Sequence, residues 1–492
     1  MNDRAIRRLG LFLMVLFAAL FAQLNYIQVF RSERLNTRPG NNRPIDQAFN
    51  KPRGTVVTAD GVVLARSVPV DTKKKYQREF PEKDRYAAIT GYFNYSFGAT
   101  GLEAAYNEEL AGTKAEQQVR TFEDLVKERD SSGNLQLTVR DDVQQTAIDA
   151  LGDRRGSVVA IEPATGDLLA LWSWPSYDPN LLSTHDQGKA DDAKAFLEAV
   201  PGNPLLPRTY RETYAPGSTF KVVTAATGVQ TGTVTPDDPA YPVERTFQPP
   251  QTQRALPNFG GSACGGTLFT ILAKSCNTSF ARMGLEIGGP DLVAGAEAFG
   301  FNQRPPLDLP AVESTFPDID YKERQPELAY SAIGQQSVTA TPLQMALVAA
   351  GIANDGTVMR PHVVDRITDQ DDQVIRRIEP EVWKEAVSPE TAATVRDAMR
   401  QVVTAGSGGA VAIDGLDVGA KTGTAQTGEN SSHAWFIAWA TRPGETTPFI
   451  AVAVVVLNQT GIAEGTGGRT AGPIARAVIE QALTDPTRGG GR

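Results

Sequence analysis

The chain has 492 residues, too many for one ordinary domain, so two or three domains are expected. Hydrophobic residues make up 41% of it, a normal share for globular proteins and enough for a substantial core. The formal net charge of −9 argues against a general nucleic-acid-binding protein, which would carry a basic patch. The three histidines, His185, His362 and His433, are scattered, and no Cys/His cluster has metal-ligand spacing, so no metal site is expected.

An apolar stretch near the N-terminus has the length of a membrane-spanning helix. Arg4, Arg7 and Arg8 precede residues 11–30, which are dominated by Leu, Phe, Ala and Val. About 20 such residues cross a bilayer as a helix. The positive-inside rule then places the first eight residues (1–8) in the cytoplasm, the anchor at 9–30 and the rest of the chain outside. The alternative is a cleaved signal peptide, but no clear A-x-A site follows the apolar run.

Only two cysteines occur, Cys264 and Cys276. Outside the cytoplasm, an oxidising compartment would permit a disulfide between them. The alternative is a pair of free, buried thiols. The cysteine count alone leaves both readings open.

The region after the anchor predicts a small domain of short elements. Residues 31–50 are polar and turn-rich, which is typical of a linker. Apolar and β-branched runs flank Asp60-Gly61, a pattern that favours a β-hairpin. Residues 101–112 have the apolar spacing of one helix with a glycine stop. We interpret residues 31–137 as an N-terminal pedestal or dimerisation-like domain.

The second domain, predicted at 138–485, combines strands at both ends with helices between them, which indicates one mixed sheet covered by helices. A helix is expected at 141–151 and a hairpin at 157–172. From Ser218 to about residue 360 the pattern is mostly helical. Further predicted elements are a strand at 135–139, helices at 339–353, 389–403 and 473–483, and strands at 415–424, 434–440 and 449–457, the last two short. Residues 486–492 are expected to be a disordered tail.

Ser218 and Lys221 form the stretch of clearest chemical interest. They lie three residues apart at a predicted helix start, after Pro216 and Gly217. Residues at i and i+3 share a helix face, so the lysine amine is expected to reach the serine hydroxyl. A hydroxyl beside a basic amine, at the positive end of a helix dipole, suits an activated nucleophile. Alone the pattern is weak, because serine after Pro-Gly is also a common helix N-cap.

Two further motifs follow in order. They are Ser-Cys-Asn at 275–277 and Lys-Thr-Gly at 421–423, the second in a strand-like segment. The set S-x-x-K, S-D-N and K-T-G is the signature of penicillin-binding proteins and class A β-lactamases. Each motif alone could have a purely structural role, with its serine or asparagine in a turn or its lysine in solvent. Three such motifs seldom occur in this order by chance.

On these motifs the chain resembles the class B penicillin-binding proteins, the single-pass, monofunctional D,D-transpeptidases of peptidoglycan synthesis, and its small N-terminal module resembles that of the actinobacterial members. Cys276 departs from the pattern, since Asp is the commoner middle residue there. The segments that extend the resemblance along nearly the whole chain are Arg53-Gly54 with Asp60-Gly61, Gly101-Leu102-Glu103, 166–170, 178–180, Gly334-Gln335, 341–344 and 433–436. The resemblance implies an α+β transpeptidase domain with a mixed, largely antiparallel sheet, helices on both faces and an all-helical subdomain, preceded by the anchor and pedestal.

The resemblance also implies a role for each motif residue. Ser218 would attack the penultimate D-alanine carbonyl of a stem peptide, with Lys221 as the base, and Ser275 would relay the proton to the leaving amine. Burial and the nearby charge of Lys421 would favour the neutral form of Lys221. Asn277 is expected to hold the donor amide, and Lys421, Thr422 and Thr424 to bind a carboxylate. Gly423 would admit the substrate backbone. The N–H groups of Ser218 and Thr424 would form the oxyanion hole.

No cofactor is implied. The expected partners are stem peptides ending in D-Ala-D-Ala, β-lactams, the cytoplasmic membrane, a polytopic glycan polymerase and other division or elongation proteins, and nucleic acid is not among them. A D,D-carboxypeptidase or a β-lactamase would share the acylation steps but transfer the acyl group to water. A class A β-lactamase uses an additional Glu, and no Glu-x-x-Leu-Asn segment lies between Ser275 and Lys421.

Two other readings are weaker. A β-lactam sensor or an inactive divisome scaffold would be a non-enzymatic alternative, but the intact motifs argue against inactivity and only about eight residues are expected inside the cytoplasm. A Ser-His-Asp triad would need a G-x-S-x-G elbow, which the residues before Ser218 do not form. His433 is expected to be mainly structural.

Overall fold

The computed structural model describes residues 3–27, 48–114, 117, 130–426, 431–460 and 466–484. These residues fall into two compact units, one formed by α1 with residues 48–52 and 68–77, the other by residues 53–67 and the chain from residue 78 onward. Most of the predicted linker and all of the predicted tail at 486–492 lie outside the described residues. The candidate site lies within the second unit.

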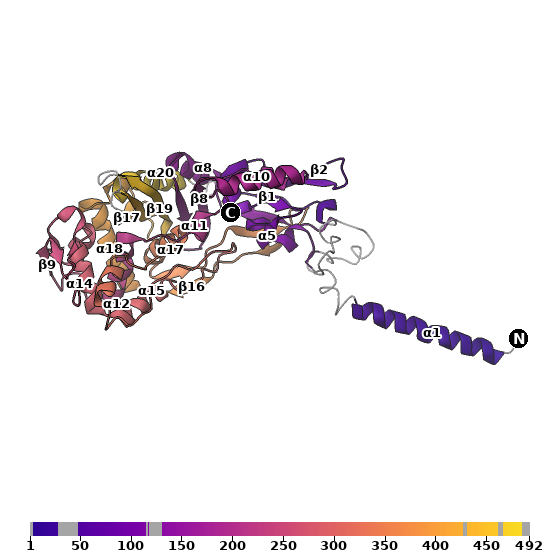
Figure 1. Ribbon diagram of the computed structural model, residues 1–492, viewed down its shortest axis with the longest axis horizontal. Coiled ribbons are helices and arrows are strands. Elements are labelled where there is room, and N and C mark those ends of the chain that lie inside the picture. The colour runs from indigo at the N-terminus through magenta and orange to yellow at the C-terminus, as the bar shows by residue number, and fades with distance from the viewer. Residues whose placement is uncertain are drawn as a thin grey trace. The chain divides into compact units, whose positions relative to one another are not determined.

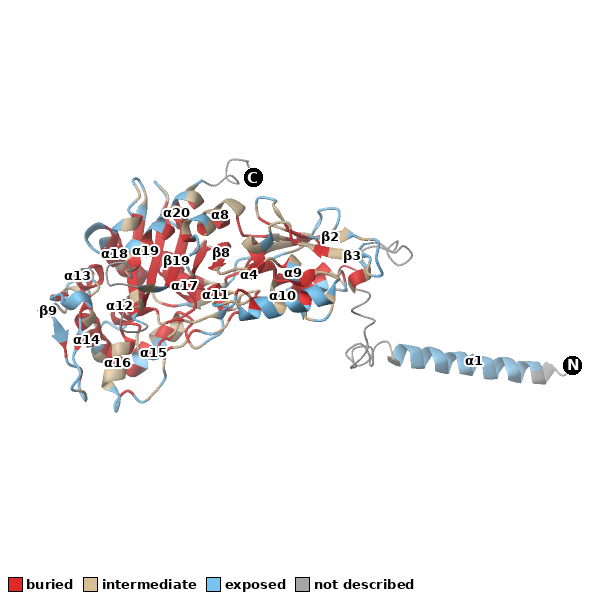
Figure 2. Ribbon diagram, turned by 45° about the horizontal axis from the view of Figure 1, so that its top comes forward, coloured by how far each residue is buried: buried red, intermediate tan, exposed pale blue. Residues whose placement is uncertain are grey.

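The N-terminal helix α1 (Asp3–Tyr26) is drawn in indigo in Figure 1. Its stretch Ile6–Tyr26 is long and apolar enough to cross a membrane. The large apolar side chains along it are exposed (Figure 2), as a lipid-facing helix requires. The helix begins before the predicted anchor because the arginines that precede the apolar run are good helix formers.

A five-stranded antiparallel sheet forms the centre of the second unit (Figure 1). Its strand order is β17-β18-β19-β7-β8. The bounds are β7 Gly156–Ile161, β8 Leu168–Trp174, β17 Asp417–Gln426, β18 Ser431–Thr441 and β19 Pro448–Thr460. Pairing of β7 with β8 confirms the predicted hairpin. The last two strands are longer than predicted, because side chains on both of their faces are buried and the apolar run therefore does not mark where the strand ends.

Helices cover both faces of this sheet. On one face lie α8 (Asp141–Leu151) and α20 (Gly472–Leu483), whose apolar side chains share a core with the sheet. On the other lies α17 (Pro342–Ala353), every residue of which is buried (Figure 2). The Thr341 side chain caps α17 by accepting a hydrogen bond from the Gln344 N–H. A helix that is apolar all round belongs inside a core.

The subdomain expected to be all-helical packs beside the sheet and is mainly helical. Its helices are α12 Lys221–Gln230, α13 Leu268–Ala273, α14 Asn277–Ile287, α15 Gly289–Ala298, α16 Gln325–Ser331 and α18 Pro389–Ala405. The prediction of a mostly helical chain from Ser218 to about residue 360 is wrong between α12 and α13. That stretch holds short paired strands, β9 Tyr241–Glu244, β10 Thr246–Phe247, β11 Leu256–Pro257 and β12 Cys264–Gly266. Its many prolines and glycines break helices, which the apolar periodicity alone does not reveal.

The N-terminal domain is built on a six-stranded sheet in the order β15-β14-β6-β1-β2-β3. Its strands and helices are β1 Val56–Val57, β2 Val63–Pro69, β3 Tyr76–Glu79, η2 Lys83–Tyr86, α4 Ala87–Thr90, β4 Phe93–Asn94, β5 Gly98–Ala99, α5 Gly101–Ala105, α6 Asn107–Leu110, β6 Asn134–Leu137, β14 Val364–Thr368 and β15 Val374–Arg377. Antiparallel pairing of β1 with β2 confirms the hairpin predicted at Asp60-Gly61. Two of its strands, β14 and β15, come from far along the chain, within the range predicted for the second domain.

The helix predicted at 101–112 is two short helices, because the chain leaves helical geometry at Tyr106 (φ −114°, ψ 31°). The first of these helices, α5, contributes Glu103 to a buried ion-pair network. The Glu103 carboxylate contacts Arg53 Nε at 2.9 Å and Arg78 Nη2 at 2.6 Å, and all three side chains are buried. Loss of one partner from such a network costs about 3–5 kcal/mol, so Arg53 and Glu103 stabilise this domain.

The remaining elements connect these layers. They are α9 Asn180–Ser183, α10 Gln187–Ala199, α11 Arg208–Arg211, η4 Gly217–Phe220, η5 Phe259–Gly261, β13 Thr357–Met359, β16 Val382–Glu385, η6 Gly409–Val411 and α19 Gly467–Thr470.

Candidate active site

Ser218 lies in a tight turn at the start of α12. The turn is the 3₁₀ helix η4 (Gly217–Phe220), and the α-helix proper begins at Lys221. Gly217 has a φ of +54°, a left-handed conformation that glycine adopts freely. Residues three apart in a 3₁₀ helix lie over one another, so Ser218 and Lys221 share a face. Ser218 is partly exposed, which leaves its hydroxyl open to a substrate.

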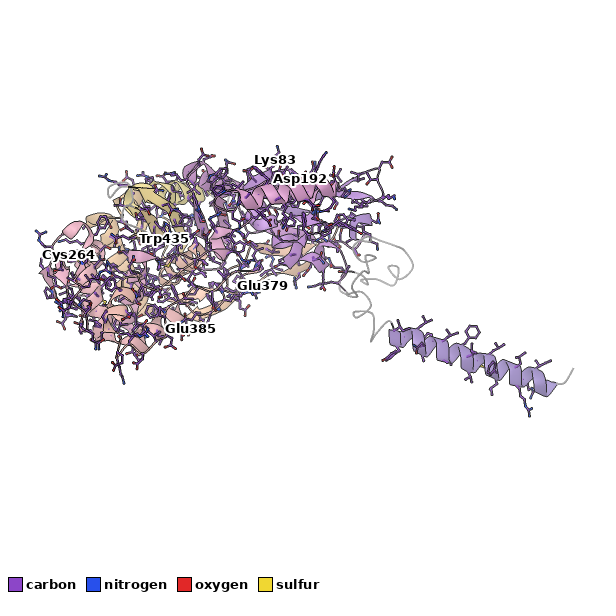
Figure 3. All side chains as sticks on the ribbon, viewed as in Figure 1. Lys83, Asp192, Cys264, Glu379, Glu385 and Trp435 are labelled. Atoms are coloured by element: carbon purple, nitrogen blue, oxygen red, sulfur yellow. A yellow bond between two sulfur atoms is a disulfide. The ribbon has the colours of Figure 1, made fainter. Side chains whose placement is uncertain are left out.

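Close backbone packing holds this turn on two sides. The Gly217 N–H donates to Gly334 O at 2.9 Å, and a Cβ on Gly334 would lie 2.2 Å from Gly217 O. A Cβ on Gly217 would lie 2.9 Å from Thr424 O, so β17 runs directly beside the turn. The indole N–H of Trp435, labelled in Figure 3, donates to Ala215 O at 3.0 Å. Ser218 therefore stands on a rigid support.

The Lys221 amine is fully buried and its hydrogen bonds reach the second motif. Nζ donates to Ser275 O at 2.7 Å, to Asn277 Oδ1 at 2.7 Å and to Ser275 Oγ at 3.3 Å. Burial, and after it the charge of Lys421, lowers the pKa of Lys221 well below its usual value. A lysine that gives up its proton easily can act as a base.

Lys421 approaches the same serine from the sheet. Its Nζ donates to Ser275 Oγ at 2.9 Å and to Thr422 O at 2.8 Å. Burial lowers the pKa of Lys421 to about 7. The Ser275 hydroxyl thus lies between two buried amines and still has its own proton to donate.

The Ser-Cys-Asn segment is held in an unusual conformation. Ser275 has a φ of +59°, which is uncommon for a residue with a side chain. Next to it, Cys276 forms a disulfide with Cys264, with the Cα atoms 5.4 Å apart. The Asn277 side chain donates from Nδ2 to Pro257 O at 3.0 Å, and this orients Oδ1 toward Lys221.

The third motif divides between the two faces of β17. Alternation places Lys421 and Gly423 on the face toward Ser218, and Thr422 and Thr424 on the other. A Cβ on Gly423 would meet the Thr219 and Trp435 side chains at 2.9 Å, so a larger residue does not fit there. The Thr422 hydroxyl is paired with Ser407 Oγ at 2.6 Å. The threonine side chains therefore lie on the opposite face of β17 from the Lys421 side chain, and the hydrogen bonds of its amine go to Ser275 Oγ and Thr422 O.

Comparisons with known proteins agree on one family. Residues 156–480 match the penicillin binding protein transpeptidase domain, and residues 53–135 match the penicillin binding protein A dimerisation domain. The peptidoglycan D,D-transpeptidase PbpA of Mycolicibacterium smegmatis is 42% identical over 98% of this chain and 99% of its own length. The protein of that name from Mycobacterium tuberculosis is 37% identical over the same shares.

The chain belongs to the class B penicillin-binding protein transpeptidases. Solved structures agree: a crystal structure of penicillin-binding protein A from M. tuberculosis matches with a TM-score of 0.82 at 36% identity, covering 89% of this chain and all of that one. A penicillin G acyl-enzyme complex of the same protein matches with a TM-score of 0.80 at 35% identity, covering 88% and 100%. The predicted fold class is therefore confirmed, although the five-stranded sheet of the transpeptidase domain is wholly antiparallel and the parallel pair, β1 with β6, lies in the N-terminal domain.

The histidines of this penicillin-binding protein have structural partners. His433 Nδ1 accepts a hydrogen bond from the Asn458 N–H at 3.2 Å, and its ring packs edge-on against Tyr214, with centroids 5.3 Å apart. Burial, followed by the charge of Arg155, lowers the pKa of His433 to about 4, so it is neutral at physiological pH. His362 Nε2 lies 2.8 Å from Asp167 Oδ1, in the turn between β7 and β8. These contacts indicate that His433 and His362 stabilise the local structure rather than take part in catalysis.

Ser407 was not among the predicted site residues. It lies in the Gly-rich loop after α18, and its hydroxyl orients that of Thr422. No motif marks this serine, because the contact depends on how the loop packs against β17. The one available signal was the glycine-rich composition of residues 406–409, which indicates a close approach of the loop to another part of the chain.

Replacing Cys264 and Cys276 together with serine is expected to lower the free energy of unfolding by about 3 kcal/mol, the loop-closure value for a separation of 12 residues. It should also slow acylation several-fold, because the bond fixes the backbone beside strained Ser275. Urea unfolding and penicillin acylation of the oxidised parent, the reduced parent and the variant measure both effects. Identical unfolding midpoints for all three would contradict the prediction.

Proposed function

We propose that this protein is a peptidoglycan D,D-transpeptidase that cross-links stem peptides through an acyl-enzyme on Ser218. The observation that carries the proposal is the Ser275 hydroxyl held between the amines of Lys221 and Lys421, at 3.3 and 2.9 Å, next to the turn that bears Ser218. This arrangement supplies a nucleophile, a base and a proton donor without a metal or cofactor. Relatives named as D,D-transpeptidases over nearly the full chain support it.

In the acylation step, Ser218 Oγ attacks the carbonyl carbon of the penultimate D-alanine and its proton passes to Lys221 Nζ. Backbone N–H groups of Ser218 and Thr424 stabilise the oxyanion, since β17 lies against the turn. The amide C–N bond then breaks, and Ser275 Oγ delivers a proton to the leaving nitrogen of the terminal D-alanine. Lys221 returns the proton to Ser275, and an ester remains on Ser218.

In the transfer step, an acceptor amine from a neighbouring stem attacks the ester. It loses one proton to Lys221, the C–O bond breaks, and Ser218 recovers its hydroxyl proton. A β-lactam follows the first step only, because its leaving nitrogen stays attached to the acyl group. In both cases Asn277 holds the donor amide, and the charged amine of Lys421 holds the carboxylate.

The test is a reaction of the full-length protein with a donor peptide ending in D-Ala-D-Ala and an acceptor amine. Release of D-alanine together with the cross-linked product is expected. D-alanine release with hydrolysis as the only outcome would indicate a carboxypeptidase. A penicillin adduct should map to Ser218 by peptide mass spectrometry and persist for hours, whereas loss within seconds would indicate a β-lactamase.

The acylation rate of the free enzyme is expected to fall about tenfold per pH unit above about 7, where Lys421 loses its proton. The rate falls with rising pH because the protonated amine of Lys421 binds the carboxylate and the neutral amine does not. Lys421→Arg should react more slowly but without this fall, because arginine stays charged. Stopped-flow measurements of acylation at limiting penicillin, from about pH 5 to about pH 9, give both profiles. If the rate of Lys421→Arg falls above about pH 7 as it does in the parent, the fall is not due to Lys421.

The same pKa has a consequence for stability. The folded pKa of Lys421, about 7, lies below its ordinary value of 10.5, so between these values the unfolded chain binds more protons. Stability contributed by this group therefore rises with pH across that window and is lost as pH falls toward 7.

We also propose that α1 anchors the protein in the cytoplasmic membrane with the N-terminus inside. The basic residues before Ile6–Tyr26 support this orientation. A monofunctional transpeptidase needs newly polymerised glycan, so a polytopic glycan polymerase and other division or elongation proteins are its proposed partners. Protease added to intact spheroplasts should digest the transpeptidase domain and spare an N-terminal tag; digestion of the tag would reverse the orientation.

A further inference from the structure

A cavity away from the catalytic motifs lies where the N-terminal domain meets the transpeptidase domain. Its volume is about 570 Å³, within the range of about 300–1,000 Å³ that ligand sites occupy. One wall is formed by α4 and the segment β5–α5, and the opposite wall by residues 204–211 and 304–310. Both walls belong to the same compact unit.

The walls of this junction pocket are mainly apolar. Small side chains from α4 and α5 form one side, and Leu205 and Leu307 with several prolines form the other. The rings of Tyr177 and Tyr210 close the pocket, and the Tyr210 hydroxyl is already engaged, donating to Ala88 O at 2.7 Å. Such walls suit the apolar body of a ligand and offer it few hydrogen-bonding groups.

The charged residues of the lining are two arginines and one aspartate, so the pocket carries a net positive charge. Arg211 and Arg304 line it, both exposed, and neither guanidinium group makes a hydrogen bond or ion pair with any part of the chain that the structure describes. The one lining carboxylate, Asp308, is occupied: it accepts from the Val363 and Val364 N–H groups, each at 3.0 Å, and from the Tyr106 hydroxyl at 3.1 Å. Two guanidinium groups at an apolar cavity are suited to a carboxylate or phosphate.

We propose that the junction pocket binds an amphipathic anion, with its apolar body between the two walls and its carboxylate or phosphate at Arg211 and Arg304. The ligand could be a free fatty carboxylate or the anionic end of a lipid, which share this chemistry. The site is separate from Ser218 and does not depend on the fate of the acyl group.

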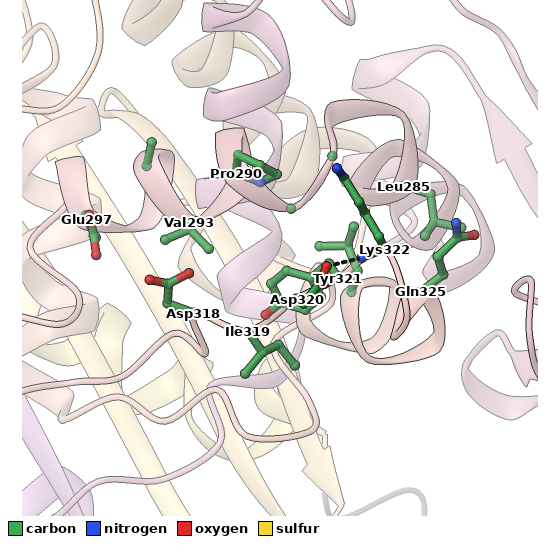
Figure 4. Close-up of a pocket in the computed structure, with 14 residues that line it drawn as sticks. Leu285, Pro290, Val293, Glu297, Asp318, Ile319, Asp320, Tyr321, Lys322 and Gln325 are labelled. Atoms are coloured by element: carbon green, nitrogen blue, oxygen red, sulfur yellow. Dashed lines mark hydrogen bonds between the residues drawn. The ribbon is translucent and has the colours of Figure 1, made fainter.

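Another pocket, in the helical subdomain, provides an internal control and is called the acidic pocket below (Figure 4). It has a similar volume, about 620 Å³, and lies between α15 and the loop that carries Tyr321. Carboxylates of Glu297, Asp318 and Asp320 line it, with Lys322 as the one lining cation. Like charges repel an anion, so an amphipathic anion should avoid this acidic pocket even though the volume would admit it.

The experiment uses the full-length protein in phosphatidylcholine nanodiscs and a decanoate analogue that carries a photoreactive diazirine. After irradiation, peptide mass spectrometry should place the adducts in residues 87–105, 204–211 or 304–310, and not at the acidic pocket. Decanoate should compete, whereas decanol and decyltrimethylammonium should not. Protection in nanodiscs containing phosphatidylglycerol would identify a lipid as the source of the ligand, and continued labelling there would identify a free amphiphile.

Variants separate charge from shape. Arg211→Gln with Arg304→Gln should reduce labelling about tenfold or more, because two charge-assisted contacts are lost. The matched control Arg254→Gln, at an exposed arginine outside the pocket, should stay within about twofold. Ala104→Trp, at an exposed position of the wall, should block labelling by filling the pocket.

Each variant must still form the penicillin adduct, which shows that it is folded. Equal competition by decanol, or unchanged labelling in the double arginine variant, would overturn the proposal. So would labelling that is confined to the acidic pocket.

Discussion

Ser218→Ala is expected to abolish the covalent penicillin adduct and to reduce transpeptidation about 10⁴-fold or more. The reason is chemical: alanine has no oxygen to form the ester, and no other hydroxyl lies one 3₁₀ turn before Lys221. Intact-mass spectrometry after incubation with penicillin G measures the adduct, and D-alanine release measures turnover. The melting temperature should change little, because Ser218 is partly exposed.

Ser262→Ala is the matched control. Ser262 is exposed and lies in the turn after η5, where its hydroxyl donates to Phe259 O. This variant should acylate like the parent. A stoichiometric adduct on the Ser218→Ala protein would show that another residue is the nucleophile.

Lys221→Met is expected to slow acylation about 10³-fold, the typical contribution of a positioned base. Methionine keeps the length of the side chain but cannot accept the Ser218 proton. It also leaves Ser275 O and Asn277 Oδ1 without the amine that contacts each at 2.7 Å. Each lost partner costs about 1–3 kcal/mol, so the melting temperature should fall by several degrees while the protein stays folded.

Lys322→Met separates the loss of a base from the loss of a lysine. Lys322 is exposed, lines the acidic pocket and takes no part in the proposed mechanism. Both rates and both melting temperatures are measured under the same conditions. A positioned base usually contributes more than about tenfold to the rate. If the acylation rate of Lys221→Met is within about tenfold of that of Lys322→Met, Lys221 is not the base.

Elements with a clear local signal were predicted well. The helix expected at 141–151 coincides with α8, and the terminal helix differs from α20 by one residue. Their apolar spacing and their flanking Gly or Pro residues are local properties. The break at Tyr106 was not predicted, because it depends on a buried ring whose hydroxyl donates to Asp308, far away in the chain.

The three catalytic motifs and their order could be read from the sequence, because each combines residue types that one chemistry requires. Their contacts could not. The Lys221 amine was expected to reach the Ser218 hydroxyl, and its three hydrogen bonds run to Ser275 and Asn277. These contacts depend on the packing of α12 against the start of α14, and the two helices are far apart in the sequence.

The family, the apolar N-terminal helix and the residues of the three motifs all follow from the amino-acid sequence without a structure. The tertiary structure decided that the two lysines share one serine hydroxyl, that Thr422 is paired with Ser407, and that β14 and β15 complete the N-terminal sheet. The physical reason is that motifs and periodicities are local, whereas burial, pKa shifts and hydrogen-bond partners arise from segments that meet only when the chain folds.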